Sequence, residues 1–118
     1  SGGLSTSGRA RRFLFICSRN RLRSPTAEHL LAEIPGVETL SAGTDRDADE
    51  PLTDELVDWA DVIFAMERRH RTKLLARHRR ALKDKRVVVL GIRDDYGFMD
   101  PRLVSLLRTK MRPWLEFQ

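Results

Sequence analysis

The stretch "RFLFICSRNRLRSPTAEHLL", Arg12–Leu31, joins a short apolar run to a helical pattern through a loop rich in arginine. The apolar run ends at Cys17, the single cysteine of the chain. A run of this length and composition is typical of a buried β-strand. Leucine and alanine at helical spacing after Pro25 predict a helix that packs on such a strand. The stretch therefore predicts a strand, a loop and a helix, the first half of a βαβ unit.

The rest of the chain continues this alternation. Further strands are expected at Val37–Gly43, Asp61–Met66 and Arg86–Ile92. Further helices are expected after the N-cap Thr53, over the basic segment Glu67–Leu82, and over Leu103–Leu115, where Pro113 is expected to kink or restart the helix. The alternation predicts an α/β fold, a single domain with a four-stranded parallel sheet and helices on both faces.

Length and composition limit the class of protein. The chain has 118 residues, of which 41% are apolar, and we expect one globular domain over residues 11–118. Residues 1–10 are expected to be a flexible tail or a remnant of cloning. No apolar run reaches membrane-spanning length, so no membrane span is expected, and no secretory signal is expected either. A single cysteine can form no internal disulfide, so a cytoplasmic protein is expected.

The net charge of +5 is unevenly distributed along the chain. Residues 45–67 hold nine acidic side chains and one basic one, whereas Arg68–Arg86 holds ten basic side chains and one acidic one. Such a basic segment attracts anions, so it is a candidate contact for an acidic partner or a nucleic acid. The alternative is a solvated helix face. Few aromatic residues interleave the segment, so it offers no platform for stacking bases.

The loop after Cys17 has the chemistry of an anion site. In parallel sheets, ligands bind beyond the carboxyl ends of the strands, which is where Cys17 is expected. Backbone N–H groups and a helix N-terminus converge at such a loop. Positive charge nearby favours the ionised, nucleophilic form of a cysteine. The guanidinium of Arg23 can donate paired hydrogen bonds to an anion of phosphate size held there.

The segment "CSRNRLRSP" resembles the C-x5-R-S-P phosphate loop of the low-molecular-weight protein tyrosine phosphatases, and looks closest to a short bacterial branch of predicted tyrosine phosphatases. The resemblance extends to Ser41–Thr44, Asp61–Glu67 and Ile92–Phe98. It implies a phosphomonoester hydrolase that acts on phosphotyrosine through a phosphocysteine intermediate. It implies no metal and no other cofactor.

The resemblance also implies a role for each residue of the loop. Cys17 would be the nucleophile, Arg23 would clamp the phosphoryl oxygens, and Ser24 would donate a hydrogen bond to the thiolate. Asn20 would hold the curl of the loop, because its side chain tolerates a left-handed backbone. The phosphate would be surrounded by Ser18, Arg19, Asn20, Arg21, Leu22 and Arg23.

The general acid implied by the resemblance is an aspartate shortly after the last strand. Aligning Tyr96 with the first tyrosine of the family's Asp-Pro-Tyr stretch favours Asp94, with Asp95 as the runner-up. Asp100 copies the family's Asp-Pro dipeptide, but it is better explained as the N-cap of the last helix, with Pro101 at the first helical position.

Two loop residues differ from the family's pattern, and a third loop residue is expected to affect substrate specificity. Arg19 replaces the usual glycine, which would strain the loop if that position required a positive φ. Leu22 replaces a second cysteine and removes reversible disulfide protection of the nucleophile. Arg21 and Tyr96 are expected at the substrate rim, where Arg21 would disfavour phosphoarginine and favour substrates with neighbouring carboxylates.

Other functions remain open from the sequence alone. They are an arsenate reductase that uses an external thiol, a nucleic-acid-associated protein that binds a terminal phosphate, and a phosphate-binding protein with weak or no turnover. The three histidines are not expected to bind metal: His78 is expected at the edge of the core, and His29 and His70 at the surface.

Overall fold

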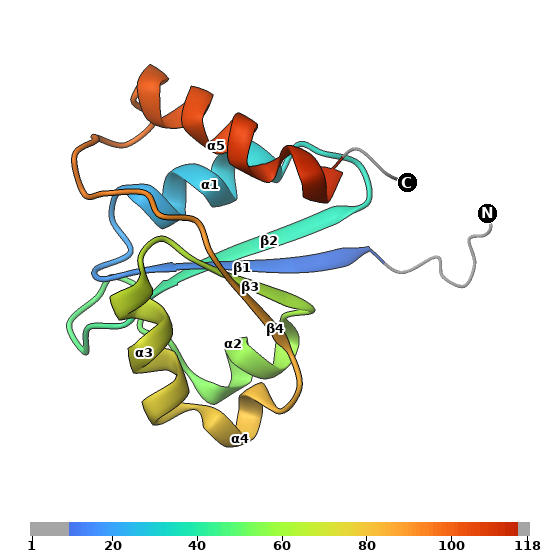
Figure 1. The fold of residues 1–118 in the computed structure, drawn as a ribbon, viewed down its shortest axis with the longest axis vertical. Helices are drawn as coiled ribbons and strands as arrows, with labels where there is room; N and C mark the ends of the chain where they lie inside the picture. The colour runs from blue at the N-terminus through green and yellow to red at the C-terminus, as the bar shows by residue number, and fades with distance from the viewer. Residues whose placement is uncertain (1–9, 116–118) are drawn as a thin grey trace.

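A four-stranded parallel sheet organises the chain in the computed structural model, which describes residues 10–115 (Figure 1). The strands are β1 (Arg11–Cys17), β2 (Val37–Gly43), β3 (Val62–Ala65) and β4 (Arg86–Val89). Their order across the sheet is β2-β1-β3-β4, and each neighbouring pair is parallel. Cys17 therefore lies at the carboxyl end of an inner strand. The tail expected over residues 1–10 lies, apart from Ala10, outside the described residues.

Helices cover both faces of the sheet, as predicted (Figure 1). In the described part of the chain they are α1 (Arg23–Leu31), α2 (Asp54–Trp59), α3 (Arg68–Arg77), α4 (Arg79–Leu82) and α5 (Pro101–Leu115). α1 and α5 lie on one face, and α2, α3 and α4 lie on the other. The predicted α/β architecture is confirmed. No helix within residues 10–115 is long and apolar enough to cross a membrane.

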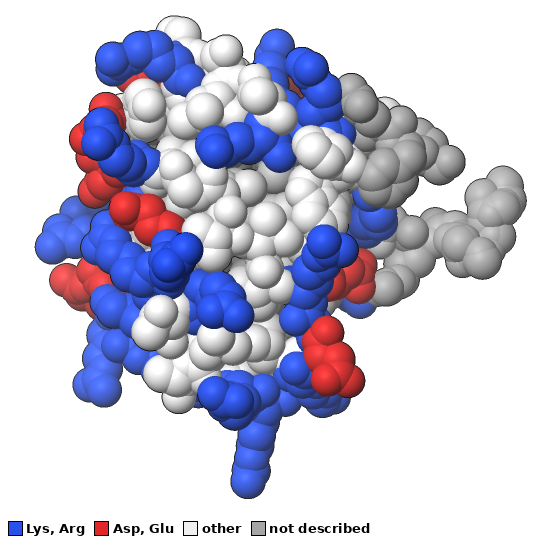
Figure 2. Space-filling view, viewed as in Figure 1, with Lys and Arg blue, Asp and Glu red and all other residues white. Residues whose placement is uncertain are grey.

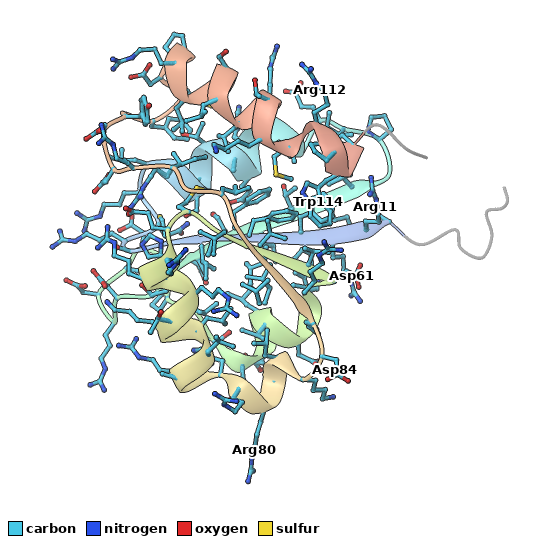
Figure 3. The ribbon with its side chains drawn as sticks, in the orientation of Figure 1. Arg11, Asp61, Arg80, Asp84, Arg112 and Trp114 are labelled. Atoms are coloured by element: carbon cyan, nitrogen blue, oxygen red, sulfur yellow. The ribbon has the colours of Figure 1, made fainter. Side chains whose placement is uncertain are left out.

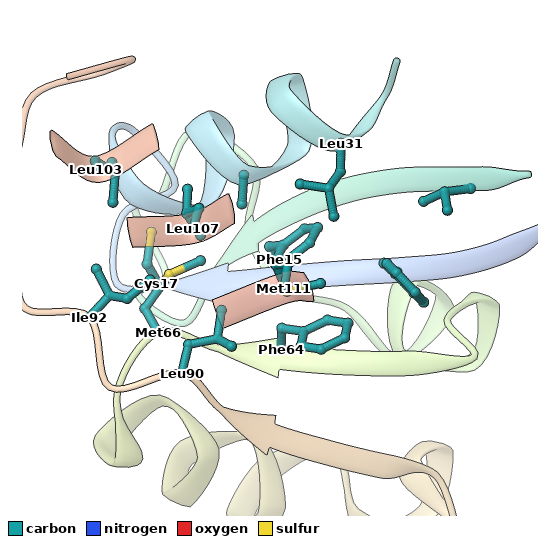
Figure 4. Packing of buried hydrophobic residues seen from close by; sticks show 13 residues of the cluster. Phe15, Cys17, Leu31, Phe64, Met66, Leu90, Ile92, Leu103, Leu107 and Met111 are labelled. Atoms are coloured by element: carbon teal, nitrogen blue, oxygen red, sulfur yellow. The ribbon is translucent and has the colours of Figure 1, made fainter. Parts of the chain in front are cut away.

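Alternate residues of β1 enter two separate layers of the core. Phe13 and Phe15 join the cluster beneath α1 and α5, whereas Leu14 and Ile16 join the cluster beneath α2 and α3. Phe15 stacks on Phe64 with a centroid distance of 5.2 Å (Figure 4). Full burial of a side chain of this kind contributes about 1.5–3 kcal/mol. Packing on both faces gives the loop after Cys17 a rigid starting point.

The basic segment does not form the single helix expected over Glu67–Leu82. It forms α3 and α4, which are separated at His78, where φ is −128° and ψ is 29°. His78 Nδ1 lies 2.6 Å from a carboxylate oxygen of Asp54 in α2. This tertiary contact accompanies the break, and helical periodicity in the sequence does not encode it. His78 lies at the edge of the core, as expected, with a side chain that is 15% exposed.

The last two strands are shorter than the predicted Asp61–Met66 and Arg86–Ile92. Beyond β4 the chain nevertheless follows the edge of the sheet, because the N–H of Ile92 donates to the carbonyl of Met66 at 2.8 Å. This extension carries the residues after Ile92 to the carboxyl end of the sheet, where Cys17 lies.

α5 begins where the sequence predicted. Asp100 Oδ1 accepts the N–H of Arg102 at 2.9 Å, so Asp100 caps the helix and Pro101 is its first residue. The helix continues through Pro113 to Leu115, so the restart expected as one alternative at Pro113 is wrong, and the other alternative, a kink, stays a prediction.

The C-terminal end of α5 contacts residues of β1, β3 and β4. Arg11 Nη1 donates to the carbonyl of Trp114 at 2.7 Å, and both residues lie at the same end of the molecule (Figure 3). The Trp114 ring meets Phe64 edge-on at 5.2 Å, and the Arg86 guanidinium lies 4.9 Å from the Trp114 ring centroid. These contacts close the core at the end of β1 opposite to Cys17.

Candidate active site

The loop after β1 is bound along its backbone to the segment after β2. The N–H of Thr44 donates to the carbonyl of Cys17 at 2.8 Å, and the N–H of Asp45 donates to the carbonyl of Ser18 at 2.9 Å. A Cβ at Gly43 would lie 2.5 Å from the carbonyl oxygen of Ser18, so only glycine fits there. The "SAGT" segment therefore serves as a platform for the loop.

Asn20 organises the buried side of the loop. Its φ of 58° is left-handed, a conformation that asparagine adopts more readily than most residues. Asn20 Nδ2 donates to Ser24 Oγ at 3.0 Å and to Ser41 Oγ at 2.8 Å. Ser41 in turn donates to the carboxylate of Glu28. The donated hydrogen bonds run from the loop to β2 and on to α1, and they fix the curl of the loop.

Ser24 stands directly beside the cysteine. Its Oγ lies 2.9 Å from Cys17 Sγ, and both side chains are buried. Because Ser24 Oγ accepts from Asn20, its own hydrogen is available to donate to sulfur. A hydroxyl in this orientation stabilises a thiolate and, after reaction, a departing thiolate.

Arg19 is not strained in place of the family's usual glycine. Among the non-glycine residues of the described chain, positive φ occurs at Asn20, Lys83 and Met99. Arg19 is therefore outside the left-handed region, and its side chain is exposed, 3.9 Å from Asp45. The condition under which Arg19 would strain the loop, a positive φ, is therefore not met.

Arg23 is almost completely buried, with 2% of its surface exposed. Its Nη1 donates to Glu67 Oε1 at 2.7 Å and to the carbonyl of Ile92 at 2.8 Å. Its Nε lies 3.7 Å from an oxygen of Asp94. The hydrogen bond from Arg23 lowers the pKa of Glu67, with a smaller contribution from Arg69. No role was predicted for Glu67 from the sequence, although it lies in the "DVIFAME" segment.

His70 is fully buried, so the expectation of a surface position is wrong. Its Nδ1 accepts the N–H of Glu67 at 3.0 Å, so the proton resides on Nε2, which lies 3.0 Å from Ser18 Oγ. Burial, followed by the charge of Arg23, lowers the pKa of His70 to about 4. The neutral ring braces the first residue of the loop. The spacing of Glu67 and His70 is that of a capping box, a signal that could have located them.

The loop encloses one side of a cavity of about 490 Å³. Its lining within the described chain is Cys17, Ser18, Arg19, Arg21, Leu22, Arg23, Asp45, Arg69 and Asp94. The structure thus brings the cysteine, the arginine and the favoured aspartate, Asp94, to one cavity, while Asn20 and Ser24 support it from behind. Arg21 is paired with Asp49 at 3.2 Å, and Leu22 presents an apolar surface that is 38% exposed.

The other aspartates and Tyr96 lie elsewhere. Asp95 pairs with Arg93 at 3.1 Å and does not line this cavity. Tyr96 packs against the core beside α5 and lines a different cavity, with the Arg102 guanidinium 5.4 Å from its ring centroid. The structure therefore does not place Tyr96 at the expected rim. His29 is exposed, as expected, with its ring against Phe98.

Within residues 10–115, no three side chains of His, Cys, Asp or Glu converge in a group that could hold a metal ion.

No family model and no curated protein matches the chain, but solved structures do. The arginine phosphatase YwlE from Geobacillus stearothermophilus is 27% identical, with a TM-score of 0.69 over 90% of this chain and 94% of that one. The tyrosine phosphatase Wzb from Escherichia coli K30, in complex with phosphate, is 24% identical, with a TM-score of 0.72 over 91% and 97%. SP-PTP, the low-molecular-weight protein tyrosine phosphatase from Streptococcus pyogenes, is 18% identical, with a TM-score of 0.74 over 89% and 91%.

These structures place the chain in a structural class. It has the fold of the low-molecular-weight protein tyrosine phosphatases, and the resemblance drawn from its sequence is confirmed at the level of fold.

Proposed function

We propose that the protein is a cysteine-dependent phosphatase that hydrolyses phosphomonoesters, with phosphotyrosine in cytoplasmic proteins as its substrate. The proposal rests on one observation: a thiol, a buried guanidinium and a carboxylate line the same cavity. Cys17, Arg23 and Asp94 all line it, and Ser24 lies 2.9 Å from the sulfur. The similarity to solved tyrosine and arginine phosphatases supports the same class of reaction.

Binding of the phosphoryl group uses the part of Arg23 that the protein leaves available. A guanidinium has five N–H groups, and the two on Nη1 are taken by Glu67 and Ile92. The groups on Nη2 and Nε remain for phosphoryl oxygens. Because the side chain is buried and held at Nη1, its charge is preorganised for the charge that develops in the transition state.

The reaction proceeds in two displacements. The Cys17 thiolate attacks phosphorus, the S–P bond forms, and the ester P–O bond breaks as Asp94 gives its proton to the leaving oxygen. The Asp94 carboxylate then takes a proton from water, whose oxygen attacks phosphorus. The S–P bond breaks, phosphate leaves, and the thiolate is accepted again by the Ser24 hydroxyl. Asp94 lies beside Arg23 at the mouth of the cavity, where a leaving group would emerge.

An aryl leaving group suits the rim better than a guanidinium. Leu22 offers an apolar surface to a ring. Arg21 and Arg69 also line the cavity, and although each pairs with a carboxylate, Asp49 and Glu67, neither favours the cationic head of phosphoarginine.

The test is phosphate release from phosphotyrosine, phosphoserine and phosphoarginine peptides by the wild-type protein and by Cys17→Ser. Turnover of phosphotyrosine that is lost in Cys17→Ser supports the proposal. Faster turnover of phosphoarginine would contradict phosphotyrosine as the substrate. Binding of vanadate without turnover would indicate a phosphate-binding protein that lacks phosphatase activity. Thiol-dependent reduction of arsenate without phosphate release would indicate an arsenate reductase.

A further inference from the structure

A second cavity, of about 270 Å³, lies next to the cavity of Cys17. Its lining within the described chain is Gly43, Thr44, Asp45, Arg46, Pro51, Leu52, Lys73, Arg77 and His78. Asp45 lines both cavities, so the two adjoin at this residue. The mechanism proposed above uses none of the side chains that are particular to the second cavity.

The second cavity carries an excess of positive charge. Asp45 is its one carboxylate, and Lys73 and Arg19 already lie 3.5 Å and 3.9 Å from it. Arg46 and Arg77 have no carboxylate within 4.0 Å in the part of the chain that the structure describes. Arg77 is held in place by a hydrogen bond from Nη1 to the carbonyl of Thr44 at 2.6 Å. Its fixed guanidinium is suited to pair with a carboxylate or a phosphate.

A buried hydroxyl in the lining lacks a partner. Thr44 is 4% exposed, and its Oγ1 makes no hydrogen bond within residues 10–115. A buried hydroxyl without a partner is unfavourable, and a ligand that accepts its hydrogen removes that cost. The backbone of Thr44 also donates to the carbonyl of Cys17. An anion bound beside Thr44 would therefore be held in a fixed relation to the nucleophile.

The shape of the lining narrows the kind of anion. Pro51 and Leu52 add apolar surface to a lining that also holds the cations Lys73 and Arg77 of α3. A glutamate side chain combines apolar methylene groups with a terminal carboxylate and matches both parts. Lysine and arginine side chains gather over α3 and α4 (Figure 2), and α3 supplies Lys73 and Arg77 to the lining of the cavity. That surface favours approach of an acidic polypeptide.

We propose that the second cavity binds the carboxylate of an acidic residue close in sequence to the phosphorylated residue of the substrate. Lys73, Arg77 and the Thr44 hydroxyl would hold the carboxylate while the phosphoryl group enters the cavity of Cys17. The inference rests on the proposed function, because it assumes that a phosphorylated polypeptide is the substrate. It assigns the protein a preference for acidic phosphorylation sites.

The test measures binding of paired phosphotyrosine peptides to the Cys17→Ser protein, so that it does not depend on turnover. In each pair one position near the phosphotyrosine is Glu or Gln, and the position is moved along the peptide. Dissociation constants are compared for Cys17→Ser alone and with Lys73→Gln and Arg77→Gln added. The matched control adds Arg80→Gln instead, because Arg80 projects from α4 away from the body of the molecule (Figure 3).

One glutamate position should bind about three- to tenfold more tightly than its glutamine partner, as expected for a partly exposed charged hydrogen bond. Lys73→Gln and Arg77→Gln should remove that ratio, and Arg80→Gln should keep it. Equal affinity at every position, or loss of the ratio in Arg80→Gln, would overturn the inference, as would failure of every peptide to bind. Tighter binding of free phosphate that depends on Arg77 but gives no glutamate preference would instead indicate a site for a small anion. Turnover of the glutamine peptides by the wild-type protein tests the proposed function separately.

Discussion

The substitution Glu67→Gln tests how much the ion pair that holds Arg23 contributes to stability and to catalysis. Glu67 Oε1 lies 2.7 Å from Arg23 Nη1, and the Ile92 carbonyl is the second acceptor for that nitrogen. Glutamine keeps the shape of the side chain and can still accept a hydrogen bond, but it lacks the negative charge. The substitution therefore weakens one of two contacts that fix the guanidinium and leaves the other intact.

The expected loss of stability at neutral pH is about 1 kcal/mol. Hydrogen bonds to charged groups contribute about 1.5–3 kcal/mol, and solvent screening reduces that range here because the Glu67 side chain is 29% exposed. A comparable loss of transition-state stabilisation would lower kcat/KM about fivefold, since about 1.4 kcal/mol corresponds to a factor of ten. KM for a small aryl phosphate should rise as well, because Arg23 binds the phosphoryl group in the ground state.

The pH dependence gives the sharper test. Arg23 lowers the pKa of Glu67 from its ordinary value of 4.5, so the folded protein binds this proton less readily than the unfolded chain. The stabilisation is therefore fully present above pH 4.5 and is lost as pH falls through the lowered pKa. Denaturation of wild type and Glu67→Gln should differ most at neutral pH and converge in acid.

Glu33→Gln is the matched control, because Glu33 is an exposed glutamate outside the site. It should change neither stability nor its pH dependence beyond a few tenths of a kcal/mol. A difference between wild type and Glu67→Gln that persists unchanged at low pH would refute the charged contact. So would normal kcat/KM in Glu67→Gln.

Three further substitutions test the roles in the cavity. Cys17→Ser should abolish turnover and retain phosphate binding, measured by calorimetry; hydrolysis near the wild-type rate would remove Cys17 from the mechanism. Vanadate should raise the Tm by mass action, and Arg23→Ala should erase that rise while Arg80→Ala keeps it; equal loss in both would indicate bulk charge. Asp94→Asn should slow phenyl phosphate far more than nitrophenyl phosphate, because general acid catalysis contributes about 10²–10⁴-fold when the leaving group is poor. The same leaving-group dependence in Asp95→Asn alone would move the role to Asp95.

The parts predicted well from the sequence depend on local pattern. The apolar run before Cys17, the N-cap at Thr53 and the Asp100-Pro101 start of α5 each carry their signal within a few residues. The sheet followed because alternating strands and helices have few allowed arrangements. Local pattern also placed the loop at the carboxyl end of β1.

The parts that the sequence did not predict depend on contacts between distant segments. His70 looks like a surface residue in a basic helix, and its burial follows from packing against Ser18 of the loop. Tyr96 was placed by alignment, but its ring packs beside α5 and Arg102. In both cases the side chain's neighbours come from segments that a linear pattern does not bring together.

Glu67 and His70 connect the start of α3 to both ends of the loop. Glu67 holds Arg23 at the end of the loop, and His70 holds Ser18 at its beginning. The two residues also cap each other, which fixes the first turn of α3. Because α3 carries Lys73 and Arg77, the cap sets the second cavity in position relative to the first. Binding at the two cavities should therefore be coupled through α3. The effects of Glu67→Gln and Lys73→Gln on the dissociation constant of a phosphotyrosine peptide should not add up in the double variant, as is typical of residues in one network.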